Sequence, residues 1–236
     1  DWLISQPYVD AARSGLLGTC VGGSFALMAS ASALIRERVA YASAYAPYTS
    51  IWTFGRDIAS ASVESAGGRA AWKVDQLTRR VFVYSLTAYL EPDEAERMRA
   101  ALSVVGGQMD DDGLSPEGKA VHALLSAPDV ETAEKAIRSL PDCVMRELGN
   151  ISPLDYAQDI RAPLIVLLHD RGDQVIPVGE TRRLVAALDG RSGLEYTEMQ
   201  FQHLDPQKAK MPVTVLAREL MKFFRAVYPI FRQTVR

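Results

Sequence analysis

The stretch Ser14-Gly15-Leu16-Leu17-Gly18-Thr19-Cys20-Val21-Gly22-Gly23 runs from an apolar segment through a glycine-flanked cysteine into a row of small residues. The apolar segment predicts a short strand, and residues 23–35, which are small or apolar and contain no proline, predict a helix packed closely on a sheet. A sharp turn between them needs small residues two positions before and two positions after its centre, to avoid a clash across the turn. Gly18 and Gly22 meet that need, so Cys20 is expected at the apex.

The pattern G-x-C-x-G is the cysteine form of a nucleophile elbow, a strand-turn-helix junction that exposes a reactive side chain. The free N–H groups and the dipole of the following helix are expected to lower the pKa of the Cys20 thiol and to hold an oxyanion, with the Val21 N–H as donor. A buried structural cysteine in a glycine-rich turn is the alternative interpretation.

The downstream sequence favours the catalytic interpretation, because an acid and then a histidine follow in the order that an elbow requires. Residues 162–169 form a continuous apolar run, typical of a buried parallel strand, and Asp173 follows in a loop. Asp170 is the rival acid. A second strand is expected at residues 193–199, and His203 comes directly after it. His169 is expected to shape the acid loop by hydrogen bonding.

In these residues the chain resembles the α/β-hydrolase superfamily, and within it the dienelactone hydrolase-like group with its elbow G-x-C-x-G-G. The resemblance covers residues 1–53 and 151–236, the predicted hydrolase core. It implies an α/β fold with a parallel sheet, in which Cys20 is the nucleophile, His203 is the general base and Asp173 orients the imidazole. A non-catalytic loop histidine is the alternative for His203.

Residues 54–150 depart from the family pattern. One βα unit of about 30 residues is enough to join the elbow to the acid strand, so about a hundred residues are inserted. The insertion is expected to be all helical, with helix starts at Pro92, Ser115-Pro116 and Asp129. It is expected to form a lid that sets substrate choice, or else a helical elaboration without substrate contact. Candidates for the substrate pocket are Tyr45, Tyr48 and Trp52, for which core packing is an equal alternative.

The resemblance also implies about four strands before the elbow, whereas only residues 1–12 precede it here. Four strands are expected, near residues 15–18, 38–45, 163–168 and 194–200. The elbow strand would then have an open apolar edge, which favours pairing with another chain or with a missing N-terminal part. Loss of that part would leave Val21 as the one evident oxyanion donor, and losing one donor lowers the rate about a hundredfold or more.

Composition is that of a globular protein with one domain and an insertion: 236 residues, 48% hydrophobic, with a formal net charge of −3. No basic face points to nucleic acid, and no apolar run is long enough to span a bilayer. Asp110-Asp111-Asp112 is expected to be a solvated turn and not a metal site. No cofactor is predicted. The apolar positions of residues 213–227 are expected to pack on the sheet, namely Val213, Leu216, Leu220, Phe223, Phe224 and Val227.

The predicted activity is hydrolysis of an ester, thioester or lactone of a small-molecule acyl substrate, through an acyl-thioester on Cys20. An acyltransferase with the same triad and a non-catalytic binding module are the alternatives. Cys143 is expected to be structural, and a free thiol at the elbow indicates the cytoplasm.

Overall fold

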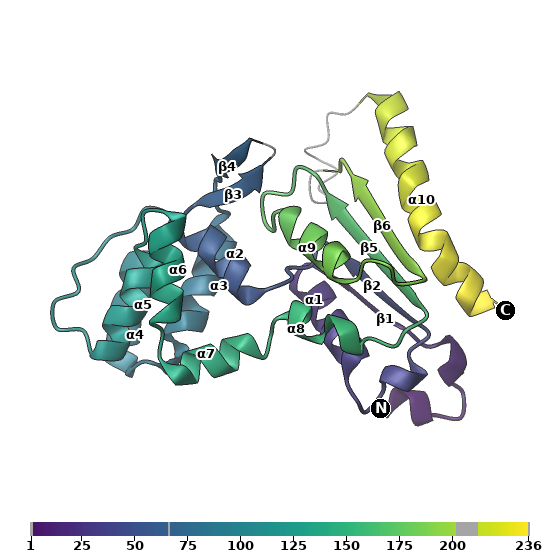
Figure 1. Cartoon of the computed structure of the whole chain (residues 1–236), viewed down its shortest axis with the longest axis horizontal. Coiled ribbons are helices and arrows are strands. Elements are labelled where there is room, and N and C mark those ends of the chain that lie inside the picture. Colours follow the sequence, from purple (N-terminus) through teal and green to yellow (C-terminus); the bar gives the residue numbers. More distant parts are fainter. Residues whose placement is uncertain (1, 66, 202–211, 236) are drawn as a thin grey trace. The chain divides into compact units, whose positions relative to one another are not determined.

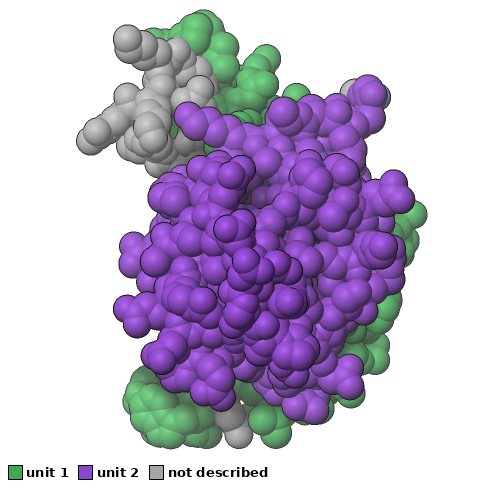
Figure 2. Space-filling model, turned by 90° about the vertical axis from the view of Figure 1, so that its left-hand side faces the viewer, with its two compact units in different colours: residues 1–50, 151–236 green, residues 51–150 purple. Residues whose placement is uncertain are grey.

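The computed structural model describes residues 2–65, 67–201 and 212–235. It divides the chain into two compact units (Figures 1 and 2): residues 1–50 with 151–236 form the first unit, and residues 51–150 form the second. The boundaries expected from the sequence lie after residues 53 and 150.

The first unit is built on a parallel four-stranded sheet of order β1-β2-β5-β6 (Figure 1). Its strands are Leu16–Thr19 (β1), Tyr41–Tyr45 (β2), Leu164–Asp170 (β5) and Leu194–Met199 (β6). All four lie where the sequence predicted strands. β1 is an edge strand, and its Leu17 side chain is 66% exposed, as expected for an open apolar edge.

Helices cover both faces of this sheet, which makes the first unit an α/β structure. Helices α1 (Val21–Ala31) and α9 (Gly179–Ala187) bury one apolar cluster against β2 and β5. Helix α10 (Val213–Val235) buries the other cluster against β5 and β6. Alternate residues of β5 serve the two clusters, Ile165 and Leu167 on the α1 side and Val166 and Leu168 on the α10 side. Burial of both faces explains the continuous apolar run seen in the sequence.

Only part of the apolar surface of helix α10 packs on the sheet. Ala226 and Ile230 are buried, with Phe223 and Val227 packed beside them, so the prediction that this helix packs on the sheet is confirmed for its C-terminal half. It is wrong for several positions of the predicted face, because their side chains are more than a third exposed: Val213, Leu216, Leu220 and Phe224. The positions of α10 that pack on the sheet extend from Phe223 to Ile230.

The second unit is mainly helical. Its helices are α2 (Ile51–Ala59), α3 (Gln76–Leu86), α4 (Pro92–Leu102), α5 (Pro116–Leu125), α6 (Val130–Arg138) and α7 (Asp142–Gly149). The three predicted helix starts are confirmed. Pro92 opens α4, the Ser115 side chain accepts the Gly118 N–H at the start of α5, and Asp129 accepts the Thr132 N–H at the start of α6.

The expectation of an all-helical insertion is wrong, because a β-hairpin follows α2. Strand β3 (Ser62–Ser65) pairs antiparallel with β4 (Gly68–Ala71). The hairpin is fastened by Arg69, whose guanidinium contacts the buried Asp57 carboxylate at 2.6 Å and the Ser62 carbonyl at 2.6 Å. Because the hairpin is mostly exposed and is held by a charged contact, its sequence lacks the alternation of apolar and polar residues that predicts a strand.

The shorter elements connect the larger ones. Helix α8 spans Pro153–Tyr156, and 3-10 turns lie at Leu3–Ser5, Ala11–Arg13, Arg36–Arg38, Thr87–Tyr89 and Ala157–Asp159. The predicted solvated turn at residues 110–112 is exposed. Within the described parts of the chain, none of the helices has the length and apolar character needed to cross a membrane.

The two chain segments that join the units are fastened within the first unit. The buried Glu180 carboxylate of α9 accepts the backbone N–H groups of Thr49 and Ser50, at 2.8 and 3.1 Å. The Leu154 N–H donates to the Thr49 carbonyl at 2.9 Å, and the Tyr48 hydroxyl donates to the Ile151 carbonyl at 2.7 Å. The exit and the return of the chain are therefore tied to each other and to α9.

Candidate active site

Cys20 lies between β1 and α1 in a backbone conformation that side chains rarely adopt. Its φ is 53° and its ψ is −132°. Its N–H donates to the Tyr45 carbonyl of β2 at 2.8 Å, and its carbonyl accepts the Gly23 N–H at 2.9 Å. The sheet thus holds one side of the residue and the first turn of α1 holds the other. This is the strand-turn-helix junction that the sequence predicted.

The glycines around Cys20 do not all serve the purpose predicted for them. A Cβ on Gly18 would overlap the Gly22 carbonyl oxygen. The tight turn therefore requires glycine at position 18, as predicted. A Cβ on Gly22 would meet nothing within 4 Å, so the predicted steric reason for Gly22 is wrong. Gly23 is the second crowded position, because its Cβ would lie 3.1 Å from the Gly18 carbonyl oxygen and 3.2 Å from the Ala44 Cβ. The space at Gly23 is small because α1 packs closely on β1 and β2.

The prediction of a lowered thiol pKa at Cys20 is wrong. Burial raises the pKa of the thiol, and the charge of Asp173 raises it further. The backbone N–H of Val21 hydrogen-bonds to the sulfur and opposes these effects without overcoming them. The helix terminus does act on the thiol as expected, but loss of solvent outweighs it. The sulfur is therefore a protonated thiol at neutral pH and needs a base for attack.

The acid loop follows β5 at the same edge of the sheet as Cys20. Asp173 is buried, and its Oδ1 accepts the N–H groups of Val175 and Ile176 at 2.7 and 3.0 Å. Asp170 is also buried, and its Oδ1 accepts the Gly172 N–H at 2.7 Å, which closes the turn. Of the two carboxylates, Asp173 is the one whose charge acts on the pKa of the Cys20 thiol.

His169 is fully buried below this loop. Its Nε2 donates to the Ile176 carbonyl at 2.9 Å and lies 3.7 Å from Asp173 Oδ2, and its Nδ1 lies 2.6 Å from Thr181 Oγ1. Burial lowers the pKa of this imidazole, which keeps it neutral. The expectation that His169 shapes the acid loop by hydrogen bonding is confirmed. His203, the predicted general base, lies outside the described residues.

The three predicted pocket residues differ in their surroundings. Tyr45 is buried on the α10 side of β2, and its hydroxyl has no hydrogen-bond partner among the described residues. Burial raises the pKa of Tyr45, and the charges of Asp170 and Asp173 add to this effect. Tyr48 is buried and uses its hydroxyl to hold Ile151. Trp52 belongs to α2 of the second unit, half-buried there. Their contact with substrate stays a prediction.

Sequence reasoning missed Glu180 and Thr181, which link the acid loop to the exit of the chain. Thr181 contacts His169, and Glu180 holds the backbone of residues 49 and 50. A glutamate in the first turn of a helix is commonly an exposed partner of the helix dipole, so nothing in the sequence indicated its burial. No group of three or more possible metal-ligating side chains occurs within the described ranges.

Comparison with known proteins gave solved structures only. No protein-family model and no curated protein matches the chain. An acylaminoacyl peptidase of Pyrococcus horikoshii is 14% identical with a TM-score of 0.45, over 95% of this chain and 25% of its own. An α/β-hydrolase from a Penicillium species is 19% identical with a TM-score of 0.41, over 96% and 68%. An acetylester hydrolase from Corynebacterium glutamicum is 15% identical with a TM-score of 0.41, over 98% and 64%. The chain thus spans about a quarter of the length of the peptidase.

Proposed function

We propose that this chain is a hydrolase of esters, thioesters or lactones, of the dienelactone hydrolase-like type, that uses Cys20 as its nucleophile. Asp173 orients His203, His203 is the general base, and the Val21 N–H stabilises the oxyanion. The backbone of Cys20 carries this proposal: a non-glycine residue is held at φ 53° and ψ −132° at the start of a helix, with a backbone N–H on its sulfur.

A structural cysteine would not require this backbone. Conformations outside the populated regions cost about 1–3 kcal/mol and persist where the surroundings determine them, most often at functional sites. At Cys20 the surroundings are the bond to Tyr45, the bond from Gly23 and the absence of a side chain at Gly18. Cys20 is only half-buried, and in the proposal its sulfur meets the substrate from the exposed side.

The raised thiol pKa determines how the reaction begins. Because the thiol is protonated, the imidazole must take its proton as the sulfur attacks the carbonyl carbon. In this proposal the Val21 N–H, which hydrogen-bonds to the sulfur, then stabilises the carbonyl oxygen of the tetrahedral intermediate. The imidazolium then gives its proton to the leaving alcohol or thiol, which yields the acyl-thioester. Water, deprotonated by the same imidazole, releases the acid and restores the thiol.

The second unit has the role of a lid in this proposal and sets the choice of substrate. Support comes from its place in the chain, since it is inserted directly after β2, the strand next to the elbow strand. Tyr45, Tyr48 and Trp52 belong to the segment that leads from β2 into this unit, and we propose them as part of the acyl pocket.

Hydrolysis of nitrophenyl esters of increasing chain length tests the proposal. We compare the wild-type protein with Cys20→Ala, Asp173→Asn and His203→Ala, and Cys143→Ala serves as the matched cysteine control, since Cys143 is half-buried in α7 of the other unit. Ester cleavage should disappear in Cys20→Ala and fall about a hundredfold or more in the other two site variants, but remain in Cys143→Ala.

Mass spectrometry of the quenched reaction adds a direct readout, because the acyl group should be found on Cys20. Cleavage that survives Cys20→Ala, or an acyl group on another residue, would contradict the proposed nucleophile. Absence of cleavage and of acylation with every ester would favour a binding module. Transfer of the acyl group to an added alcohol in preference to water would identify an acyltransferase.

A further inference from the structure

The second unit contains a cleft of about 810 Å³ whose lining belongs to that unit alone. The end of α2, the loop at residues 105–110 and the end of α5 surround it. Clefts of roughly 300–1,000 Å³ are the usual size for sites that enclose a small organic molecule. The cleft is thus large enough for such a ligand, and its polar groups indicate the chemical class of that ligand.

Arg79 of α3 forms part of the cleft wall although its side chain is almost completely buried, with 6% exposure. Its Nε donates to the Leu102 carbonyl at 3.1 Å, and its Nη2 donates to the Leu125 carbonyl at 2.7 Å. These carbonyls end α4 and α5, so two helix C-termini, which favour a nearby cation, hold the guanidinium in a fixed position. Among the described residues, Nη1 has no hydrogen-bond partner, and no carboxylate forms an ion pair with Arg79.

A buried guanidinium without an anionic partner is unusual, because buried charges are normally paired. The two carbonyls supply partial negative charge only, and burial lowers the pKa of Arg79. The side chain that carries Nη1 lines the cleft. A bound anion would complete its hydrogen bonding and compensate its charge.

The rest of the wall indicates that this anion has an apolar body. Ile58, Val74 and Val105 contribute aliphatic side chains. The polar contribution includes His122 and Ser126, whose Nε2 and Oγ lie 3.1 Å apart, and His122 Nε2 also lies 3.0 Å from the Met109 carbonyl. The acidic member, Asp110, is exposed.

We infer that the second unit binds an amphipathic organic carboxylate in this cleft, with the carboxylate on Arg79 and the apolar body along the aliphatic wall. One free guanidinium nitrogen suits a carboxylate better than a phosphate, which commonly takes several donors. The inference is independent of the proposed hydrolase, since no residue of the Cys20 site lines the cleft.

Calorimetric titration of the full chain with 4-phenylbutyrate tests this site, with 4-phenylbutyramide as the neutral ligand of the same shape and inorganic phosphate as the anion without an apolar body. The carboxylate should bind at least about tenfold more tightly than the amide, because a hydrogen bond to a charged group is lost in the amide. Phosphate should not bind measurably. Titration of the Cys20→Ala variant should give the same result, which separates this site from the proposed active site.

Two pairs of variants locate the binding. Arg79→Met should abolish the preference for the carboxylate, whereas Arg80→Met, which changes the exposed neighbouring arginine, should keep it. Because Arg79 also joins two helices, a second pair leaves it intact: Val105→Glu places a negative charge in the wall, and Val104→Glu places one beside it, both at half-exposed positions.

Val105→Glu should weaken carboxylate binding severalfold, and Val104→Glu should change it little. Equal binding of carboxylate and amide, equal effects of the two glutamates, or no binding to the wild-type protein would overturn the inference. Arg79 would then serve only to fasten α4 to α5.

Discussion

Replacing Gly18 by alanine should destabilise the elbow. The added Cβ would overlap the carbonyl group of Gly22, and neither group can move away by a side-chain rotation, so the backbone of the turn must shift. Inserting a methyl group into a well-packed site costs about 1–3 kcal/mol. A chain of this length loses about 2–4 °C of melting temperature per kcal/mol. We therefore expect the apparent Tm to fall by about 2–12 °C.

Gly22→Ala is the matched control, because it adds the same methyl group at the other glycine of the motif. There the Cβ would meet nothing within 4 Å, and the residue lies within α1. Alanine in place of glycine stabilises a helix by roughly 0.5–1 kcal/mol, so the apparent Tm should stay the same or rise by a few degrees.

Differential scanning calorimetry and circular dichroism melts of the three proteins give the comparison. Iodoacetamide labelling of Cys20 in the folded state reports in addition whether the elbow has kept its geometry, and we expect a changed labelling rate in Gly18→Ala. The steric account of the elbow fails if Gly18→Ala melts together with the wild type, or if Gly22→Ala loses as much stability as Gly18→Ala.

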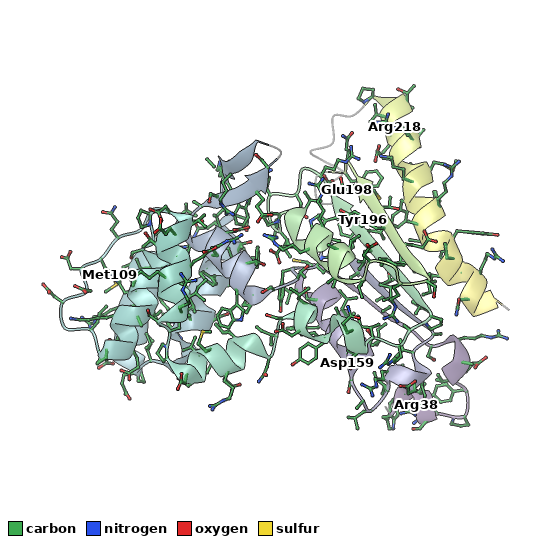
Figure 3. All side chains as sticks on the ribbon, viewed as in Figure 1. Arg38, Met109, Asp159, Tyr196, Glu198 and Arg218 are labelled. Carbon is green, nitrogen blue, oxygen red and sulfur yellow. The ribbon has the colours of Figure 1, made fainter. Side chains whose placement is uncertain are left out.

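Three further perturbations follow from the electrostatics of the first unit. Asp173→Asn removes a charge that raises the pKa of the Cys20 thiol, so the pH profile of iodoacetamide labelling should move to lower pH; an unchanged profile or a shift to higher pH would contradict this. Glu180→Ala leaves two buried backbone N–H groups, those of residues 49 and 50, without an acceptor. It should cost about 2–6 kcal/mol in urea unfolding, whereas alanine at the exposed Glu195 should cost little; equal losses would refute the role of Glu180. Hydrogen bonds from Arg182, Tyr196 and Arg171 lower the pKa of Glu198 to about 2, so its contribution to stability is complete above its ordinary pKa and is lost as the pH falls towards about 2. Urea midpoints between about pH 5 and pH 2 should therefore decline less in Glu198→Gln than in the wild type, and parallel declines would count against this assignment (Figure 3 shows Glu198 and Tyr196).

The sheet and the elbow could be predicted from the sequence because each rests on a local signal. A strand buried on both faces requires an apolar run, and residues 164–168 show one. The turn at Cys20 requires a glycine at Gly18, since a Cβ has no room there. Helix starts in the second unit were readable from Ser115 and Asp129, because their side chains cap the helices.

Features that depend on long-range burial were not readable. The hairpin of β3 and β4 is held by the Arg69–Asp57 ion pair. Such a contact does not require apolar residues at every second position, so the sequence does not show the pattern of a strand. The apolar positions of α10 identify the amphipathic side, but they do not state which of them the sheet covers: Ile230 is buried while Phe224 is exposed. The pKa of the Cys20 thiol likewise depends on how much solvent the fold removes, which the motif alone does not state.

The fastening of residues 48–50 to residues 151–154 makes the inserted unit a removable cassette. The hydrogen bonds of this junction that involve Glu180, Tyr48 and the Thr49 carbonyl are all made within the first unit. Excision of the cassette and ligation of its two ends by a few residues would leave the sheet's connectivity intact. Evolution could accordingly exchange one cassette for another of different length while the elbow and the acid loop stay in register.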